Sequence, residues 1–233
     1  MNNFLFVAIP YLALIVAVFG GLYRYFADRY SYSSVSSQLL EARLLFWGSV
    51  PWHYAIILIL LAHLVVALAP GPARVILGHP NVRTMLELAG MALALFAVFG
   101  ILILIVRRMP RRGLARASTS PMDWILLGAL LLQASSGFAV ALFDRWGSMW
   151  YLGTAVPWFW SIVTLQPDPS TVAMMPPLIQ FHFVLGFLVI LLFPFTRLVH
   201  LVTVPVSYLW RPYQLVVWNQ PPGGGRSGNS PRR

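Results

Sequence analysis

Five stretches of this chain are long and apolar enough to cross a hydrocarbon core, which takes about 20 helical residues. They lie near residues 4–23, 51–70, 86–106, 122–143 and 177–203. Only 9% of the residues are charged, far below the quarter that is usual in a soluble domain. The predicted fold class is therefore an all-α membrane protein with five transmembrane helices. This membrane domain covers residues 1–220, and residues 221–233 have the composition of a disordered tail.

Arginine supplies all 16 basic residues, and its distribution predicts the orientation of the helices, because basic residues accumulate on the cytoplasmic side. Leaving out Arg197 inside the last span, one side carries Arg24, Arg29, Arg43, Arg107, Arg108, Arg111, Arg112, Arg116, Arg211, Arg226, Arg232 and Arg233. The other side carries Arg74, Arg83 and Arg145. We expect a multi-pass protein of the inner (cytoplasmic) cell membrane with its N-terminus outside and its C-terminus in the cytoplasm. Because the basic residues flank apolar spans, no nucleic acid partner is expected.

The chain contains no cysteine. Disulfides, cysteine-ligated iron–sulfur clusters, covalent c-type haem attachment and thiol catalysis are therefore excluded within it. Any iron–sulfur relay that works with this chain must lie in a partner protein.

Four of the five histidines lie in predicted spans, where an imidazole without a partner is costly. His53 and His63 are on the second span, and His182 and His200 are on the fifth. Because these two spans run in opposite directions, we expect His53 at the depth of His200 and His63 at the depth of His182. The remaining histidine, His79, is in an outer loop.

Two histidine pairs at two depths are what two b-type haems with bis-histidine ligation require. Neutral imidazoles coordinate iron from both faces, and saturated axial positions favour electron transfer. Gly186, four residues after His182, offers room for a flat macrocycle, although plain helix packing is an equally common role for such a glycine. Zinc would need ligands that converge on one point. A proton relay would need buried acids, whereas Glu87 and Asp123 lie at span ends.

The spacing of the histidines sets a condition on the two helices. The ten residues from His53 to His63 cover roughly 15 Å of helix, whereas the eighteen from His182 to His200 cover roughly 27 Å. Straight, upright helices cannot bring both pairs level. A kink at Pro194, helix tilt or inclined haem planes would absorb the difference.

Arginines near the cytoplasmic span ends have two interpretations. Arg107, Arg108 and Arg197 could bind haem propionates through charge-assisted hydrogen bonds, or they could anchor the helices at the interface. We favour propionate binding for Arg108 and Arg197. Arg197 is one turn before His200, and Arg108 closes the third span on the same side.

Two local patterns predict structure outside the histidine spans. Ser120, Pro121 and Asp123 form a helix start, with a capping serine, proline at the first position and an acid in the first turn. The outer loop over residues 144–176 is rich in tryptophan and proline. Its portion 150–163, WYLGTAVPWFWSIV, could form a short interfacial helix or an irregular aromatic loop.

Over about residues 5–217, the chain resembles the gamma subunit of membrane-bound respiratory nitrate reductase, a family of dihaem b cytochromes. The most specific part is HFVLGFLVILLFPFTRLVHLVTVPVSYLWRPYQLV, which begins at His182 and is similar to the family's last span and exit motif. Two supporting parts are WHYAIILILLAH on the second span and YRYFADRYSYSSVSSQLL after the first.

The resemblance implies a membrane anchor that oxidises quinol. His63 and His182 would hold the iron of the outer, distal haem, and His53 and His200 the iron of the proximal haem near the cytoplasm. Electrons from menaquinol or ubiquinol would pass through both b haems to an iron–sulfur beta subunit and a molybdenum-containing alpha subunit that reduces nitrate. The iron–sulfur clusters and the molybdenum cofactor would be in those cytoplasmic partners.

The chain departs from the family pattern at the quinol site. The family has a lysine near the start of the third span, where this chain has Val82 followed by Arg83. It also has a glycine where this chain has Ala62. A guanidinium can donate to a quinone oxygen but hardly loses its proton. Arg83 and Ala62 are therefore the quinol-site candidates, and no catalytic residue is assigned.

Two alternatives stay open. The same cytochrome could work in the reverse direction, from nitrite oxidation, or serve another molybdenum or sulfur-cycle partner. A haem-free membrane anchor or transporter, whose histidines only pack, is the alternative from a different class. The arrangement of four histidines on two antiparallel spans argues against it.

Overall fold

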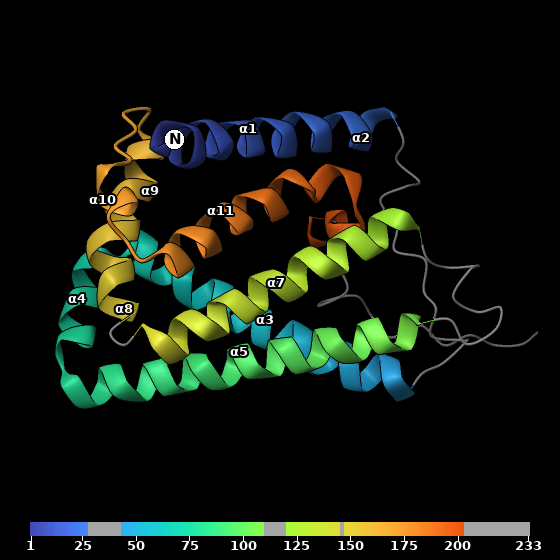
Figure 1. Cartoon of the computed structure of the whole chain (residues 1–233), viewed down its shortest axis with the longest axis horizontal. Coiled ribbons are helices and arrows are strands. Elements are labelled where there is room, and N and C mark those ends of the chain that lie inside the picture. Colours follow the sequence, from blue (N-terminus) through green and yellow to red (C-terminus); the bar gives the residue numbers. More distant parts are fainter. Residues whose placement is uncertain (28–42, 110–119, 145–146, 203–233) are drawn as a thin grey trace, which may run out of the picture. The chain divides into compact units, whose positions relative to one another are not determined.

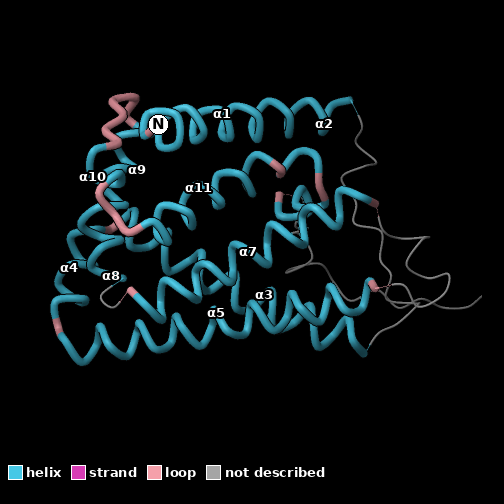
Figure 2. The backbone as a smooth tube through the Cα atoms, viewed as in Figure 1, coloured by secondary structure: helices cyan, strands magenta, loops and turns pink. Residues whose placement is uncertain are grey.

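The computed structural model describes residues 1–27, 43–109, 120–144 and 147–202. These residues are almost entirely helical, and none of them is in a strand (Figure 2). The predicted tail, the exit motif after the last span and several of the arginines used to predict orientation lie outside the described residues. The described residues all belong to one compact unit, Met1–Thr203.

Four helices are long and apolar enough to cross a membrane. The first, Phe4–Ala27, contains α1 (Ile9–Ile15) and α2 (Gly21–Ala27), each preceded by a wider helical turn, η1 (Phe4–Ala8) and η2 (Val16–Gly20). The others are α3 (Arg43–Leu68), α5 (Pro80–Arg108) and α7 (Pro121–Phe143). They coincide with the first four predicted spans and extend beyond three of them by several residues, as expected for a multi-pass membrane protein.

The fifth predicted span differs from a single helix. α11 (Pro177–Leu191) is 15 residues long, and the chain continues through two short 3₁₀ turns, η5 (Phe193–Phe195) and η6 (Arg197–Leu201). Pro194 lacks an N–H for the helix, and its ring would clash with the carbonyl four residues earlier. The helix therefore ends before Pro194, and the chain turns sharply after α11 (Figure 1).

The long helices pack as a series of neighbours: α3 against α5, α5 against α7, α7 against α11, and α11 against α1 (Figure 1). Gly48 and Gly100 let α3 and α5 approach closely, since a Cβ atom on Gly100 would lie 2.7 Å from the Gly48 carbonyl oxygen. Among the described residues, α3 and α11 make at most marginal contact with each other. α3, which carries His53 and His63, and α11, which carries His182, are thus connected through α5 and α7.

Short helices gather at the end of the bundle that holds the N-terminus (Figure 1). They are α4 (Pro70–Gly78), α8 (Gly147–Trp150), η4 (Tyr151–Ala155), α9 (Val156–Val163) and α10 (Ser170–Ala173). The stretch over residues 150–163 is therefore helical, not irregular. Pro157 stands in the first turn of α9, where its missing N–H costs no helical hydrogen bond.

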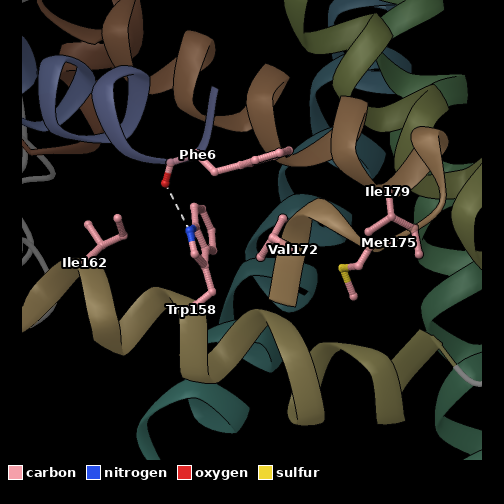
Figure 3. Close-up of a cluster of buried hydrophobic side chains, with 6 residues drawn as sticks. All are labelled: Phe6, Trp158, Ile162, Val172, Met175 and Ile179. Carbon is pink, nitrogen blue, oxygen red and sulfur yellow. Dashed lines mark hydrogen bonds between the residues drawn. The ribbon is translucent and has the colours of Figure 1, made fainter. Parts of the chain in front are cut away.

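Aromatic packing fastens these short helices to the first and last spans. Trp158 of α9 donates from its indole Nε1 to the Phe6 carbonyl oxygen at 3.0 Å, and the Phe183 ring stacks on it at 5.7 Å (the hydrogen bond is drawn in Figure 3). The buried cluster around Trp158 consists of Phe6, Trp158, Ile162, Val172, Met175 and Ile179 (Figure 3). A second cluster joins α3, α5 and α7 through Trp52, Ala55, Ala97, Ile101 and Leu127.

Candidate functional site

His53 and His200 come together at one end of the bundle. Their ring centroids are 6.1 Å apart, with an interplanar angle of 66°. The Nδ1 atom of His53 lies 2.7 Å from the Ser49 carbonyl oxygen, and Nδ1 of His200 contacts the Arg197 carbonyl oxygen. The break at Pro194 allows this meeting, because His200 sits on the separate turn η6 instead of about two and a half turns beyond Leu191 on a straight helix.

The geometry of this pair fits an iron between two imidazoles. Imidazole nitrogens bind first-row metals at about 2.0–2.1 Å, so two rings on one iron would have centroids on the order of 6 Å apart. Metal-binding histidines usually donate their other ring N–H to a backbone carbonyl or a carboxylate. With Nδ1 engaged in this way on both His53 and His200, Nε2 is the nitrogen that could coordinate iron.

His63 lies ten residues, nearly three turns, further along α3, near the short helices. Its Nδ1 atom is 2.8 Å from the Ile59 carbonyl oxygen. The Tyr151 ring packs against the imidazole at 4.9 Å between centroids, and the Tyr151 hydroxyl donates to the His63 carbonyl oxygen at 3.0 Å. Burial raises the pKa of Tyr151 to about 12, so its phenol stays protonated and remains a donor at neutral pH.

His182, in the second turn of α11, is surrounded by polar groups of α7. Ser136 Oγ lies 2.9 Å from its Nδ1 atom, and the Gln133 amide nitrogen lies 3.4 Å from its Nε2 atom. His63 is its electrostatic neighbour across the bundle. At the level of His53 and His200 the structure thus brings a histidine of α3 against one of the last span. The pairing of His63 with His182 stays a prediction. Among the described residues no group of three or more His, Asp or Glu gathers as a metal site.

Two glycines make room beside His182. A Cβ atom on Gly137 of α7 would lie 2.9 Å from Cε1 of His182, closer than real Cβ contacts. A Cβ atom on Gly186 would meet the Gln133 amide nitrogen at 3.4 Å. Gly186 therefore faces α7, and the space that it leaves accommodates Gln133.

Asp123 and Arg197 form an ion pair beside the His200 turn. Arg197 Nε is 2.9 Å from Asp123 Oδ1, and the Asp123 side chain is only 3% exposed. Asp123 also caps α7 as predicted: its backbone N–H donates to Ser120 Oγ at 3.2 Å, and its carboxylate accepts from the Ser120 N–H at 2.9 Å. Arg108, half-buried at the end of α5, lies within electrostatic range of both Asp123 and Arg197.

Arg24 of α2 contacts the segment after α11 in which the helix of the last span is broken. Its guanidinium donates to the Pro194 carbonyl oxygen at 2.8 Å and to the Thr196 carbonyl oxygen at 2.9 Å. These carbonyls stand where the helix has ended, so they need outside donors. Arg24 and Asp123 together hold the turn that carries Arg197 and His200.

The quinol-site candidates lie apart from these contacts. Arg83, in the first turn of α5, is half-buried, and its guanidinium faces the Leu77 carbonyl oxygen of α4 at 3.4 Å. Ala62 is exposed on α3, next to His63. His79 is exposed at the junction of α4 and α5.

The sequence prediction missed two groups at this site. Gln133 and Ser136 were not singled out, although a glutamine, a serine and Gly137 at positions i, i+3 and i+4 put polar and small residues on one face of an apolar span. Asp123 was considered only as an acid at a span end and in the first turn of its helix. Its ion pair with Arg197 joins residues that are far apart in the sequence, so no local sequence pattern predicts it.

Comparisons with known proteins agree with this architecture. A family model described as nitrate reductase gamma subunit matches residues 2–219. The chain is 34% identical to the nitrate reductase gamma chain of Bacillus subtilis over 207 residues, which covers 88% of this chain and 92% of the relative. It is 33% identical to the respiratory nitrate reductase 1 gamma chain of Escherichia coli over 226 residues, 93% of this chain and 97% of the relative.

A partial similarity reaches another group of reductases. One subunit of the dihydromethanophenazine:CoB–CoM heterodisulfide reductase of Methanosarcina acetivorans is 30% identical over 128 residues, 54% of this chain and 42% of the relative. The matches to gamma chains, by contrast, extend over nearly the whole sequence and include every helix described above. By the extent of these matches and by its long apolar helices, this chain belongs to the nitrate reductase gamma subunit family, the membrane-anchored subunits of respiratory nitrate reductase.

Proposed function

We propose that this chain is a dihaem cytochrome b that oxidises membrane quinol near the outer face and delivers electrons to partner subunits in the cytoplasm. The observation that carries the proposal is the approach of His53 and His200, whose ring centroids are 6.1 Å apart. His53 is on α3 and His200 follows α11, two helices that are connected mainly through α5 and α7. Family membership supports the partners: an iron–sulfur beta subunit and a molybdenum-containing alpha subunit that reduces nitrate.

When bound, two b haems supply one-electron transfer between the two sides of the membrane. In this proposal His53 and His200 hold the proximal iron, and His63 and His182 hold the distal iron. The carbonyl oxygens of Ser49 and Ile59 accept from the Nδ1–H groups of the α3 histidines, which leaves Nε2 as the coordinating atom.

Arg108 and Arg197 are proposed to face the propionates of the proximal haem. Both lie at the same end of the bundle as His200, within electrostatic range of one another. Two cations so close would repel each other, and buried Asp123 offsets part of that repulsion. A propionate arriving there would meet an excess of one positive charge from these three residues, which favours its charged form.

Quinol oxidation is proposed beside the distal pair, with its protons released outside. Arg83 and Ala62, both near the short helices, are the proposed contacts with the quinol ring. A guanidinium in place of the family's lysine can donate a hydrogen bond to a quinol oxygen but hardly accepts its proton. The proton acceptor is therefore expected to be another group or water.

The test is isolation of the complex with its native partners. We expect two b-type haems per chain by haem extraction and reduced-minus-oxidised spectra. Added quinol should reduce them and nitrate should reoxidise them through the partner subunits. A purified complex without dithionite-reducible b-haem absorbance would exclude the proposal and favour a haem-free anchor.

A second candidate is the same cytochrome serving a different reductase. The partial similarity to a heterodisulfide reductase protein, and the change of lysine to Val82 and Arg83 near the third span, favour keeping this candidate. The reverse flow of electrons, from nitrite oxidation, belongs to the same class. Nitrate-dependent reoxidation of quinol-reduced haem separates these cases, because it occurs only with a nitrate-reducing partner.

A further inference from the structure

One histidine of the site is supported differently from the other three. His53, His63 and His200 each place Nδ1 against a backbone carbonyl oxygen within their own segment. His53 Nδ1 also lies 3.1 Å from the Ser49 hydroxyl, which belongs to the same helix. His182 instead places Nδ1 2.9 Å from Ser136 Oγ, a side chain on the neighbouring helix α7. A backbone carbonyl cannot be removed by a substitution, but a hydroxyl can. The support of His182 is therefore specific to the residue at position 136.

The hydrogen bonds of Ser136 favour a proton on Nδ1 of His182. Ser136 Oγ donates its single hydrogen to the Gln133 carbonyl oxygen at 3.0 Å. With that bond formed, the hydroxyl accepts from His182, so the tautomer protonated at Nδ1 is the one that satisfies both contacts. The Gln133 amide nitrogen, 3.4 Å from Nε2, agrees, since an amide N–H donates to an unprotonated ring nitrogen. In this tautomer Nε2 carries the lone pair, and iron bound there would replace the contact with the Gln133 amide.

The surroundings leave the imidazole little freedom. Ser136 is 5% exposed, and Gly137, its neighbour, already touches the ring edge where any Cβ would collide at 2.9 Å. The carbonyl oxygen of the Gln133 side chain is buried and has no hydrogen bond within the described part of the chain. An unsatisfied polar atom next to Nε2 marks a site that this chain alone does not complete.

We propose that Ser136 is a positioning residue for His182: its hydroxyl fixes the tautomer and the aim of Nε2 toward the distal iron, from a second helix. This inference rests on the proposed function, because it concerns the ligand of the proposed distal haem. A hydrogen bond from Nδ1–H makes a histidine a stronger donor to its metal. A stronger donor stabilises the ferric state, so Ser136 lowers the reduction potential of the distal haem relative to a site without it.

If Ser136 positions His182, substitution of Ser136 should change the properties of the distal haem alone. Ser136→Ala removes the acceptor and keeps the small volume, so the potential of the distal haem should rise while that of the proximal haem stays the same. The ferric low-spin resonance signal of the distal haem should shift with it, because ring orientation also loosens. Ser136→Thr keeps the hydroxyl and should keep the wild-type potential and signal. Ser135→Ala, which changes the adjacent serine, is the matched control.

The experiment is a redox titration of the two haems in the intact complex, followed by optical and electron paramagnetic resonance spectra, for wild type and the three variants. A distal shift in Ser136→Ala that Ser136→Thr reverses supports the inference. Loss of only the distal haem in Ser136→Ala with retention in Ser136→Thr supports it as well. Both haems present with unchanged distal potential in Ser136→Ala, equal shifts of both haems, or the same defect in Ser136→Thr would overturn it. Absence of haem from the wild-type complex is a different outcome, which refutes the proposed function itself.

Discussion

At the scale of single residues, the four histidines make the sharpest prediction. If the proposed ligands are right, His53→Ala or His200→Ala should remove the proximal haem, and His63→Ala or His182→Ala should remove the distal one, because each proposed haem would lose one of two axial ligands. Haem content and the spectrum of the remaining haem in each purified variant would measure this.

The exposed fifth histidine supplies the control for that series. His79→Ala should retain both haems, since His79 is exposed at the end of α4. Spectra in which His53→Ala and His63→Ala lose the same haem would overturn the assignment of ligands to levels.

The buried carboxylate of Asp123 leads to a prediction about stability. Asp123→Asn keeps the shape of the cap but removes the charge that faces Arg197 at 2.9 Å. Breaking a buried ion pair costs about 3–5 kcal/mol. Since the Arg197 side chain is 31% exposed, we expect a cost at the lower end and a lower Tm for the detergent-solubilised complex. Retention of haem by His200 should weaken in parallel.

Asp168→Asn is the matched control for Asp123→Asn. Hydrogen bonds from the side chain and the backbone of Ser170 lower the pKa of Asp168, so it is also ionised at neutral pH. It is fully accessible to water, however, and removing its charge should leave Tm nearly unchanged. Equal losses in the two variants would show that the Asp123 pair contributes nothing specific.

The four histidines could be predicted from the sequence, but the side chains that contact them could not. Histidines stand out in an apolar span because each is costly there, so the sequence alone singles out His53, His63, His182 and His200. Ser136 carries no such signal, because a hydroxyl in a membrane helix usually bonds back to its own backbone. Only the packing of α7 against α11 makes it the partner of His182.

At the scale of elements, the break after α11 is predicted to be required for the proximal site. Pro194→Ala restores an N–H and lets the helix run on past Leu191, which would carry His200 away from His53. We expect loss of the proximal haem with the distal haem retained. Pro177→Ala, in the first turn of α11, should keep both haems, because a proline at that position replaces no helical hydrogen bond. Haem counts and spectra distinguish the variants.

The contact of α3 with α5 gives a second prediction at this scale. A Cβ atom in Gly100→Ala would lie 2.7 Å from the Gly48 carbonyl oxygen and from the Trp52 backbone nitrogen, so the helices must separate. Such overpacking costs about 1–3 kcal/mol. Gly90→Ala, on the same helix but with nothing within 4 Å, should gain about 0.5–1 kcal/mol from helix propensity. Thermal unfolding should therefore shift in opposite directions; a shift of the same sign and size would contradict the close approach.

Helices were easier to predict than their ends. Apolar length indicated four long helices, and the pattern at Ser120 indicated the start of α7 because its cap is local. Hydropathy did not reveal where α11 stops, since residues 192–201 still consist mostly of apolar residues. Pro194 marked only a kink in the sequence, and the contacts of Arg24 and Asp123 that stabilise the following turn come from distant segments.

At the scale of the whole molecule, orientation is open to a direct test. Because the sequence has no cysteine, single substitutions give clean labelling sites. Gln166→Cys, near α10, should react with a membrane-impermeant thiol reagent added from outside. Met109→Cys, just after α5, should react only after the cytoplasmic face is opened. The reverse pattern would place the N-terminus in the cytoplasm and overturn the orientation predicted from arginines.

The order in which the helices are synthesised determines when His53 and His200 can pair. Synthesis delivers His53 early, but its companion His200 emerges only after every long helix has been made. The pair of His53 and His200 is thus closed by the last described segment of the chain. A polypeptide that stops short, or that inserts one helix wrongly, cannot bring these two rings together. Occupancy of the His53–His200 site therefore requires that every long helix and the turn η6 have been made and packed.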